Sequence, residues 1–244
     1  MATVTESASS TTPLITPRSP SDTLPRLEPG DHLSRAEFER RYEARPDIPK
    51  AELIEGVVYM PSPARYTKHG RKNRHVSCWL GDYEAATPGV EGADNCSVRL
   101  DLDNEPQPDH FLLIVSERGG KSRTSDDDYV EGAPELVVEV TASSANYDLH
   151  SKKNAYRRNG VLEYVVVLTE EQRVLWFRLH EGQFVDVASD AAGIFRSEIF
   201  PGLWLDGPAL LESDLPRVKA VVEQGLATPE HVAFVKKLQL GSKG

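Results

Sequence analysis

Three uninterrupted apolar runs constrain the fold of this chain more than any other feature of its sequence. They are HFLLIV, PELVVEV and EYVVVLT, at residues 110–115, 134–140 and 163–169. Runs of this kind are typical of central strands that are covered on both faces. The segment DLHSKKNAYRRNG lies between the second and third runs and predicts a helix that ends at Gly160. This order of strand, helix and strand favours a crossover unit, and therefore an α/β fold.

Weaker patterns predict the elements that precede these strands. Ser34 and Glu37 have the spacing of a capping box, which predicts a short helix after them. The β-branched segment AELIEGVVYM, residues 51–60, predicts a strand or hairpin with a bulge at Gly56. Apolar residues at three-to-four spacing predict a helix over residues 68–86, and the first half of this helix is basic.

Two further segments have the two-residue period of strands. SVRLDLD, residues 97–103, alternates apolar with charged residues, which predicts a half-buried strand. RVLWFRLH and QFVDVA, on either side of Glu181 and Gly182, predict an antiparallel hairpin. We expect these strands to lie around the same α/β core.

Composition divides the chain into a domain with two tails. Residues 1–29 are rich in Ser, Thr and Pro, so they cannot bury enough apolar surface to offset the entropy of ordering, and we expect disorder. Residues 30–213 contain the predicted strands and helices and form one domain. Residues 214–244 predict a helical or partly disordered C-terminal tail.

Charge and cysteine content limit the class of protein. The net charge of −10 disfavours a broad phosphate-binding face, so any contact with nucleic acid must be local. Cys78 and Cys96 are too few for a disulfide framework or a four-cysteine zinc site, which favours a reducing compartment. The sequence has neither an apolar signal stretch nor a run of about 18 apolar residues. We expect a cytoplasmic protein without membrane contact.

Acidic residues stand next to two of the apolar runs. Asp109 precedes the first run and Glu139 lies near the end of the second. An isolated carboxylate in such surroundings costs roughly several kcal/mol unless it is paired or bound to metal. Because side chains alternate along a strand, Glu135 and Glu139 share one face. Taken alone, the Pro108-Asp109 pair favours a turn at the start of a strand, and only the combination of acids favours a site.

A lysine in the following helix completes this combination. Asp148, Lys152 and Tyr156 are spaced by four residues, so a helix places them on one face, close to Glu139. Taken alone, Lys152 could instead be a solvated helix lysine. Two carboxylates, a divalent metal and a lysine together can activate water and stabilise the charge that develops on a phosphorane. Magnesium suits such a site, because it prefers oxygen ligands and keeps several waters.

The order of these motifs resembles a known family. AELIEGVVYMPSP, the Pro108-Asp109 pair, PELVVEVTASS, the D-x-x-x-K-x-x-x-Y pattern, GVLEYVVV and FPGLWLD follow one another within residues 31–212. In these motifs the chain resembles the Uma-two family of restriction endonucleases. The resemblance implies the PD-(D/E)XK nuclease fold, a central mixed β-sheet flanked by helices. It also implies Mg²⁺ as the cofactor, with Mn²⁺ as a substitute.

The resemblance also implies roles for individual residues. It assigns the metal to Asp109 and Glu139, the lysine to Lys152, and a further acid to Glu52. Thr141 stands where the superfamily usually has its lysine, so the lysine must come from the next helix. The residues that we expect to support this site are Glu55, His69, Glu135, Tyr156 and, as the alternative lysine, Lys153.

The resulting prediction is a magnesium-dependent endonuclease acting on nucleic acid, with DNA as the expected substrate. A homodimer is also expected, since cutting both strands suits paired sites, and the hairpin at Glu181 could supply the contact. A nuclease-like module without activity is the alternative, supported by the acidic charge, His110 and Thr141. A hydrolase of some other phosphoester is a third possibility.

Overall fold

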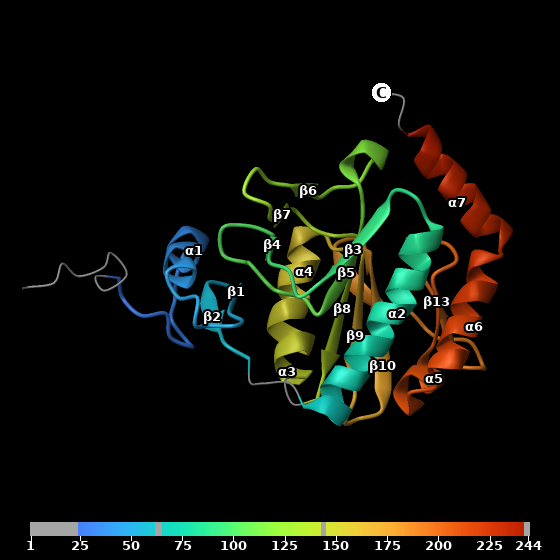
Figure 1. Ribbon diagram of the computed structural model, residues 1–244, viewed down its shortest axis with the longest axis horizontal. Coiled ribbons are helices and arrows are strands. Elements are labelled where there is room, and N and C mark those ends of the chain that lie inside the picture. Colours follow the sequence, from blue (N-terminus) through green and yellow to red (C-terminus); the bar gives the residue numbers. More distant parts are fainter. Residues whose placement is uncertain (1–23, 62–64, 143–144, 242–244) are drawn as a thin grey trace, which may run out of the picture.

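The computed structural model describes residues 24–61, 65–142 and 145–241, and its centre is a six-stranded mixed sheet (Figure 1). The strand order is β11-β10-β9-β8-β5-β3. β8 and β9 are parallel, and the other neighbours are antiparallel. The strands are β3 (Val90–Asp94), β5 (His110–Ile114), β8 (Leu136–Thr141), β9 (Glu163–Leu168), β10 (Arg173–His180) and β11 (Gln183–Asp186).

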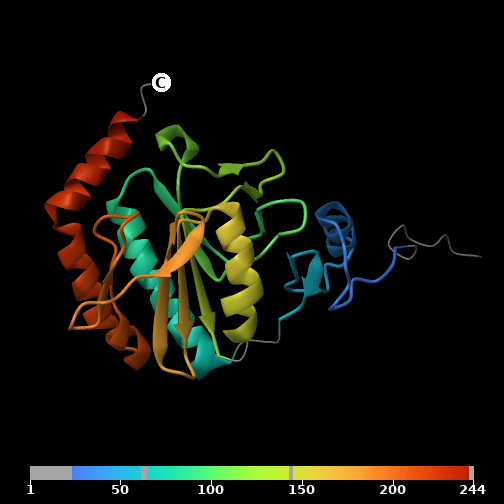
Figure 2. The ribbon, with the colours of Figure 1, turned by 180° about the vertical axis from the view of Figure 1, so that it is seen from behind.

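Helices cover both faces of this sheet. In Figure 1 the sheet lies between α4 on one side and α2, α5 and α6 on the other, and Figure 2 shows the same layers from behind. The helical elements are α1 (Arg35–Glu43), η2 (Tyr66–Gly70), α2 (Arg71–Ala86), η3 (Ser116–Arg118), α3 (Ala145–Tyr147), η4 (Asp148–Lys152), α4 (Lys153–Asn159), α5 (Gly207–Glu212), α6 (Leu215–Leu226) and α7 (Pro229–Leu240). The mixed α/β sheet flanked by helices confirms the predicted fold class.

Side chains of β8 alternate between two separate cores. Leu136 and Val138 pack with Trp79 of α2, whereas Val137 packs with Tyr156 of α4. This alternation follows from the two-residue period of a strand. Glu139 therefore projects toward the α4 side of the sheet.

Short strands surround the central sheet. They are β1 (Glu52–Ile54), β2 (Val57–Tyr59), β4 (Val98–Arg99), β6 (Arg123–Thr124), β7 (Val130–Glu131), β12 (Ile194–Arg196) and β13 (Trp204–Asp206). β1 and β2 form a hairpin that packs with α1 around Leu53 and Phe38. An isolated bridge between Leu53 and Glu105 joins this hairpin to the segment that leads into β5.

The hairpins form where the sequence predicts them, but the prediction of a bulge at Gly56 was wrong. Glu55 and Gly56 have φ angles of 53° and 75°, so they form a two-residue turn with no extra residue in either strand. Such turns match the twist of antiparallel strands. Glu181 and Gly182 make the same kind of turn between β10 and β11, with φ angles of 49° and 77°.

Two local predictions were wrong. α1 forms without the capping box, because the Glu37 carboxylate accepts hydrogen bonds from Arg40 and Arg41 instead, and the Ser34 side chain caps nothing. The segment 97–103 contributes only the two-residue β4, and Leu102 is 75% exposed. Here the backbone turns after β4, so the alternating pattern does not correspond to a strand.

The two predicted tails differ in what the structure describes. Residues 1–23 of the predicted N-terminal tail lie outside the described residues, while Leu27 is 2% exposed and packs with α1. The C-terminal segment forms α6 and α7, whose Val218, Val222 and Leu238 belong to the main core. No helix in the described part of the chain is both long and apolar enough to cross a membrane.

Candidate functional site

Two carboxylates meet on the α4 face of the sheet, where β5 begins. The register pairs His110 with Val138, which places Asp109 beside Glu139 on the neighbouring strand. The backbone N–H of Asp109 lies 3.4 Å from Glu139 Oε2, and the N–H of Val140 donates to Asp109 Oδ2 at 2.9 Å. Antiparallel pairing of β5 with β8 therefore brings together two acids that are 30 residues apart.

Lys152 reaches these carboxylates from the helix that follows β8. Its Nζ lies 2.9 Å from Glu139 Oε1, 2.8 Å from Glu52 Oε1 and 3.8 Å from Asp148 Oδ1. The hydroxyl of Tyr156 also donates to Glu139 Oε1, at 2.9 Å. The predicted face of the helix thus points at Glu139, although residues 148–152 form a π-turn, a distortion that is frequent at functional sites.

Glu52 joins the site because the β1–β2 hairpin is attached to the segment before β5. The N–H of Gln107 donates to Glu52 Oε1 at 2.7 Å. The same oxygen contacts Lys152. Glu52 is 3% exposed, so the hairpin closes one side of the carboxylate cluster.

Asp109 has two cationic or protonatable neighbours. Lys50 Nζ lies 3.7 Å from Asp109 Oδ1, and His69 Nε2 lies 3.3 Å from Asp109 Oδ2. His69 was predicted as a supporting residue, whereas Lys50 was missed. A signal existed for Lys50, because it stands two residues before Glu52 and alternation along an extended chain directs both side chains to one face.

The buried part of the cluster carries more negative than positive charge. Glu52, Asp109, Glu139 and Asp148 are each at most 6% exposed, and so is Lys152, which lies between three of them. Lys152, the Lys50 ammonium beside Asp109 and a proton on Glu139 compensate part of this charge. Burying the carboxylate charge that remains is unfavourable unless a further cation compensates it. The excess of negative charge therefore favours binding of a further cation at the carboxylate cluster.

The pKa values reflect this crowding. Burial raises the pKa of Glu139 to about 8, the nearby Lys152 opposes this rise, and the charge of Asp109 adds to it. Burial also acts to raise the pKa of Asp109, but the hydrogen bond from His69 and the charge of Lys50 outweigh it, so this pKa lies well below its usual range. Burial would lower the pKa of Lys152, yet the surrounding carboxylates hold it well above its usual range. At neutral pH Asp109 and Lys152 are therefore both charged.

The donor atoms suit a hard divalent cation. Asp109 and Glu139 offer carboxylate oxygens, the ligands that Mg²⁺ prefers, and Mg²⁺ fills its remaining positions with water. Within residues 24–61, 65–142 and 145–241, no three His, Cys, Asp or Glu side chains converge closely enough to hold a metal by themselves. The fit therefore rests on two carboxylates, on water and on the uncompensated negative charge.

Three residues that we expected to support the site lie elsewhere. Glu135 accepts hydrogen bonds from the N–H groups of Ile114 and Lys121, at the opposite end of β8. Glu55 binds the side chain of Asn154 at the rim of the hairpin. Lys153 packs its ammonium 3.2 Å from the ring centre of Phe177, because it points away from Lys152 on the helix.

His110 has a structural contact on the opposite face. Its Nδ1 lies 2.7 Å from Asp94 Oδ1 and its Nε2 lies 2.6 Å from Asn73 Oδ1 of α2. The ring is fully buried. His110 therefore ties β5 to β3 and α2 without entering the carboxylate cluster.

Comparisons with known proteins identify the family and the fold. The sequence model of the Uma2 family, described as "Putative restriction endonuclease", matches residues 35–208. The crystal structure of a "putative nuclease belonging to DUF820" from Anabaena variabilis is similar with a TM-score of 0.53 and 16% identity, over 67% of this chain and 92% of that chain. No curated protein matches the sequence. At this identity the structural likeness shows the fold alone, and the fold is the predicted nuclease-like one.

Proposed function

The chain belongs to the Uma2 family, and from this premise we propose that it is a magnesium-dependent nuclease that hydrolyses phosphodiester bonds of DNA. One observation carries the proposal. The Lys152 ammonium is buried between Glu139 and Glu52, at 2.9 and 2.8 Å, beside the ionised Asp109. Carboxylates that can hold a divalent metal, next to an amine, can together activate water for the cleavage of a phosphodiester.

Each residue has a defined task in this proposal. Asp109 and Glu139 hold Mg²⁺, which when bound lowers the pKa of water and compensates the charge on the phosphorane. Lys152 holds and orients the attacking water at the side of Glu139. Glu52 keeps the Lys152 ammonium in place, at 2.8 Å. Tyr156 fixes the orientation of Glu139 through the hydrogen bond to Oε1.

Lys152 takes the role of the lysine that the superfamily usually has at the position of Thr141. Thr141 is the last residue of β8, two positions after Glu139. The Lys152 ammonium lies 2.9 Å from Glu139 although its backbone belongs to η4. A long and flexible lysine stem permits this, because the position of the ammonium group matters and the origin of its backbone does not.

The test combines metal binding with cleavage. Calorimetry measures binding of Mg²⁺, and plasmid, single-stranded DNA and RNA are then incubated with the protein in Mg²⁺ or in EDTA. We expect cleavage of DNA in Mg²⁺ only. Cleavage of RNA alone would contradict the proposed substrate, and metal binding without cleavage of nucleic acid would favour another phosphoester. Absence of metal binding would favour the inactive module.

Asp109→Asn isolates the role of the carboxylate at nearly constant volume. Loss of residues that only support metal ligands already costs about 10- to 100-fold, so we expect cleavage to fall by more than about a hundredfold. Asp126→Asn is the matched control, since Asp126 is exposed in the loop before β7. An Asp109→Asn protein that is folded and cleaves at the wild-type rate after repurification refutes the site. The homodimer and the cytoplasmic location stay predictions.

A further inference from the structure

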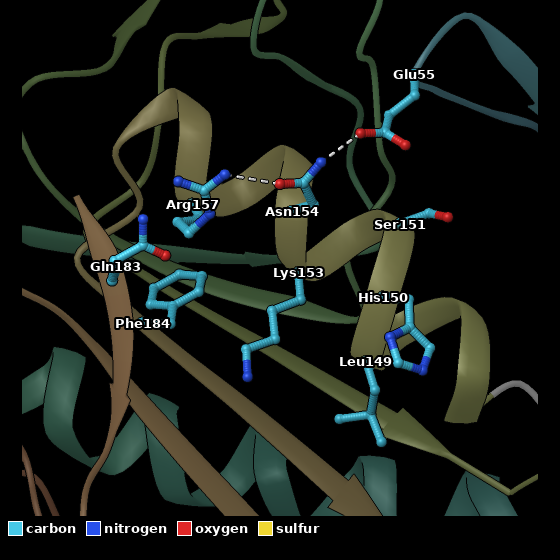
Figure 3. Close-up of a pocket in the computed structure, with 9 residues that line it drawn as sticks. All are labelled: Glu55, Leu149, His150, Ser151, Lys153, Asn154, Arg157, Gln183 and Phe184. Atoms are coloured by element: carbon cyan, nitrogen blue, oxygen red, sulfur yellow. Dashed lines mark hydrogen bonds between the residues drawn. The ribbon is translucent and has the colours of Figure 1, made fainter.

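The outer side of α4 lines a hollow that is separate from the carboxylate cluster (Figure 3). The hollow has a volume of about 480 Å³ and lies between η4, α4 and the start of β11, with Glu55 at its rim. Ligand sites for small molecules typically measure about 300–1,000 Å³. The hollow is therefore large enough for one nucleotide.

Two cationic side chains, Lys153 and Arg157, line the hollow, and neither forms an ion pair with a carboxylate of the described residues. Among the described residues, no carboxylate lies within ion-pair distance of Lys153, whose ammonium packs over the Phe177 ring. Burial lowers the pKa of Lys153, and the charge of Asp186 opposes this only in part. Arg157 bonds only neutral groups here, since it donates to the carbonyl of Gly182 and to Asn154 Oδ1, both at 2.8 Å. In a chain of net charge −10, two such cations in one hollow point to an anionic ligand.

The wall of the hollow adds an aromatic surface and amide groups. Figure 3 shows the Phe184 ring, the Gln183 amide and the Lys153 side chain around the same space. Phe184 is held by stacking on Tyr164, with ring centres 6.0 Å apart and an interplanar angle of 27°. An aromatic ring that is fixed by a neighbour can stack against a base without ordering cost, and such stacking tolerates every base.

The rim carboxylate does not oppose an anion strongly. Glu55 accepts a hydrogen bond from Asn154 at 2.6 Å and lies 3.4 Å from Arg158. Its negative charge is therefore compensated on the outer side of the hairpin turn. Lys153 and Arg157 therefore supply more positive charge to the lining of the hollow than Glu55 supplies negative charge.

We propose that this hollow binds a nucleotide, with its phosphate on Lys153 and Arg157 and its base against Phe184. The inference rests on the proposed function for the source of the nucleotide, which is either a nucleic-acid strand or a free product. It adds a subsite to that function, because the last residue of η4, Lys152, points at the carboxylate cluster, while the first residue of α4, Lys153, lines the hollow. Nucleotide binding here requires no metal.

Binding is measured by calorimetry on the full chain in EDTA, where the proposed cleavage does not occur. The probes are deoxyadenosine 5′-monophosphate, deoxyadenosine, inorganic phosphate and a 5′-phosphorylated tetranucleotide. We expect the monophosphate to bind and the nucleoside to bind weakly or not at all. Equal affinities for monophosphate and tetranucleotide identify a free nucleotide as the ligand, and a preference for the tetranucleotide identifies a strand. No binding of either refutes the proposal.

Variants connect binding to the named residues. Lys153→Gln is expected to weaken binding of the monophosphate by about tenfold or more, as for loss of a charged hydrogen-bond donor. Lys153→Arg keeps the charge and retains binding. Lys236→Gln, at an exposed position of α7, changes the net charge equally and leaves binding unchanged. Wild-type affinity in Lys153→Gln, or equal losses in Lys153→Gln and Lys236→Gln, overturns the site.

The base contact has its own test. Phe184→Leu keeps an apolar side chain, so it is expected to weaken binding of the monophosphate while leaving inorganic phosphate unaffected. Unchanged monophosphate affinity in this variant overturns the placement of the base.

Lys153-dependent binding without any cleavage in Mg²⁺ contradicts the proposed function alone. Cleavage together with binding that does not depend on Lys153 contradicts the subsite alone.

Discussion

Replacing Lys152 with methionine tests the electrostatic account of the carboxylate cluster. Methionine nearly preserves the volume of the side chain but removes the charge that lies 2.8 Å from Glu52 and 2.9 Å from Glu139. Removing one partner of a buried ion pair costs about 3–5 kcal/mol, because the remaining charges stay buried. For a domain of this size, each kcal/mol lowers Tm by about 2–4 °C. We therefore expect Tm to fall by about 6–20 °C.

The size of this loss should depend on pH. Burial already raises the pKa of Glu139 to about 8, and loss of Lys152 raises it further. A folded-state pKa above the unfolded value means that stability is lost as pH rises through the folded pKa. The difference in Tm between wild type and Lys152→Met is therefore smaller at pH 6 than at pH 9, since Glu139 takes up a proton at the lower pH.

The assay is thermal unfolding followed by circular dichroism, in EDTA and at both pH values. Lys153→Met is the matched control, since it removes a lysine from the next helical position, where the ammonium packs over the Phe177 ring. Such a contact is worth about 0.5–1 kcal/mol. Adding Glu139→Gln to Lys152→Met should recover part of the loss. Equal Tm values for Lys152→Met and Lys153→Met, at both pH values, refute the reasoning.

Three further predictions concern other parts of the fold and site. Burial raises the pKa of Glu105 to about 8, so the wild type loses stability as pH rises from about 4.5 through 8. In urea unfolding, Glu105→Gln should therefore be more stable than the wild type at pH 9, with little difference between the two at pH 5. Tyr156→Phe removes the hydroxyl that bonds the β8 carboxylate, so calorimetry should show Mg²⁺ affinity lowered about 10- to 100-fold with the fold unchanged. Gly225→Ala places a methyl group against the backbone of the loop before β13 and should destabilise the protein by about 1–3 kcal/mol. Gly81→Ala is its control, because a methyl group there meets nothing within 4 Å, and should be stabilising by about 0.5–1 kcal/mol.

Much of the fold follows from short stretches of sequence. The three apolar runs became β5, β8 and β9, and the helix between the last two makes them parallel. These predictions succeeded because burial on both faces leaves a continuous apolar pattern within one strand. Predictions that rested on a single spacing failed. The spacing of Ser34 and Glu37 made no capping box, since two arginines compete for the Glu37 carboxylate.

The site was only partly determined in this way. The sequence singles out Asp109, Glu139 and Lys152, because charged residues beside apolar runs are costly to bury unless they are paired or bind a ligand. The structure brings these three residues together. Lys50 was missed, since its contact with Asp109 spans 59 positions of the chain and depends on how the β1–β2 hairpin is attached. The alternation of Lys50 with Glu52 places both side chains on one face, but it does not show that Lys50 contacts Asp109.

The sequence by itself determined which residue types stand at the ends of the buried strands and which helix face carries a lysine. It favoured Lys152 over Lys153, through the four-residue spacing from Asp148 and Tyr156, but it did not show which ammonium group contacts Glu139. Consecutive residues of a helix point about 100° apart, so the rotation of η4 and α4 on the sheet decides which ammonium meets Glu139. Only tertiary packing fixes that rotation, through Tyr156 in the core on one side and the hollow around Lys153 on the other.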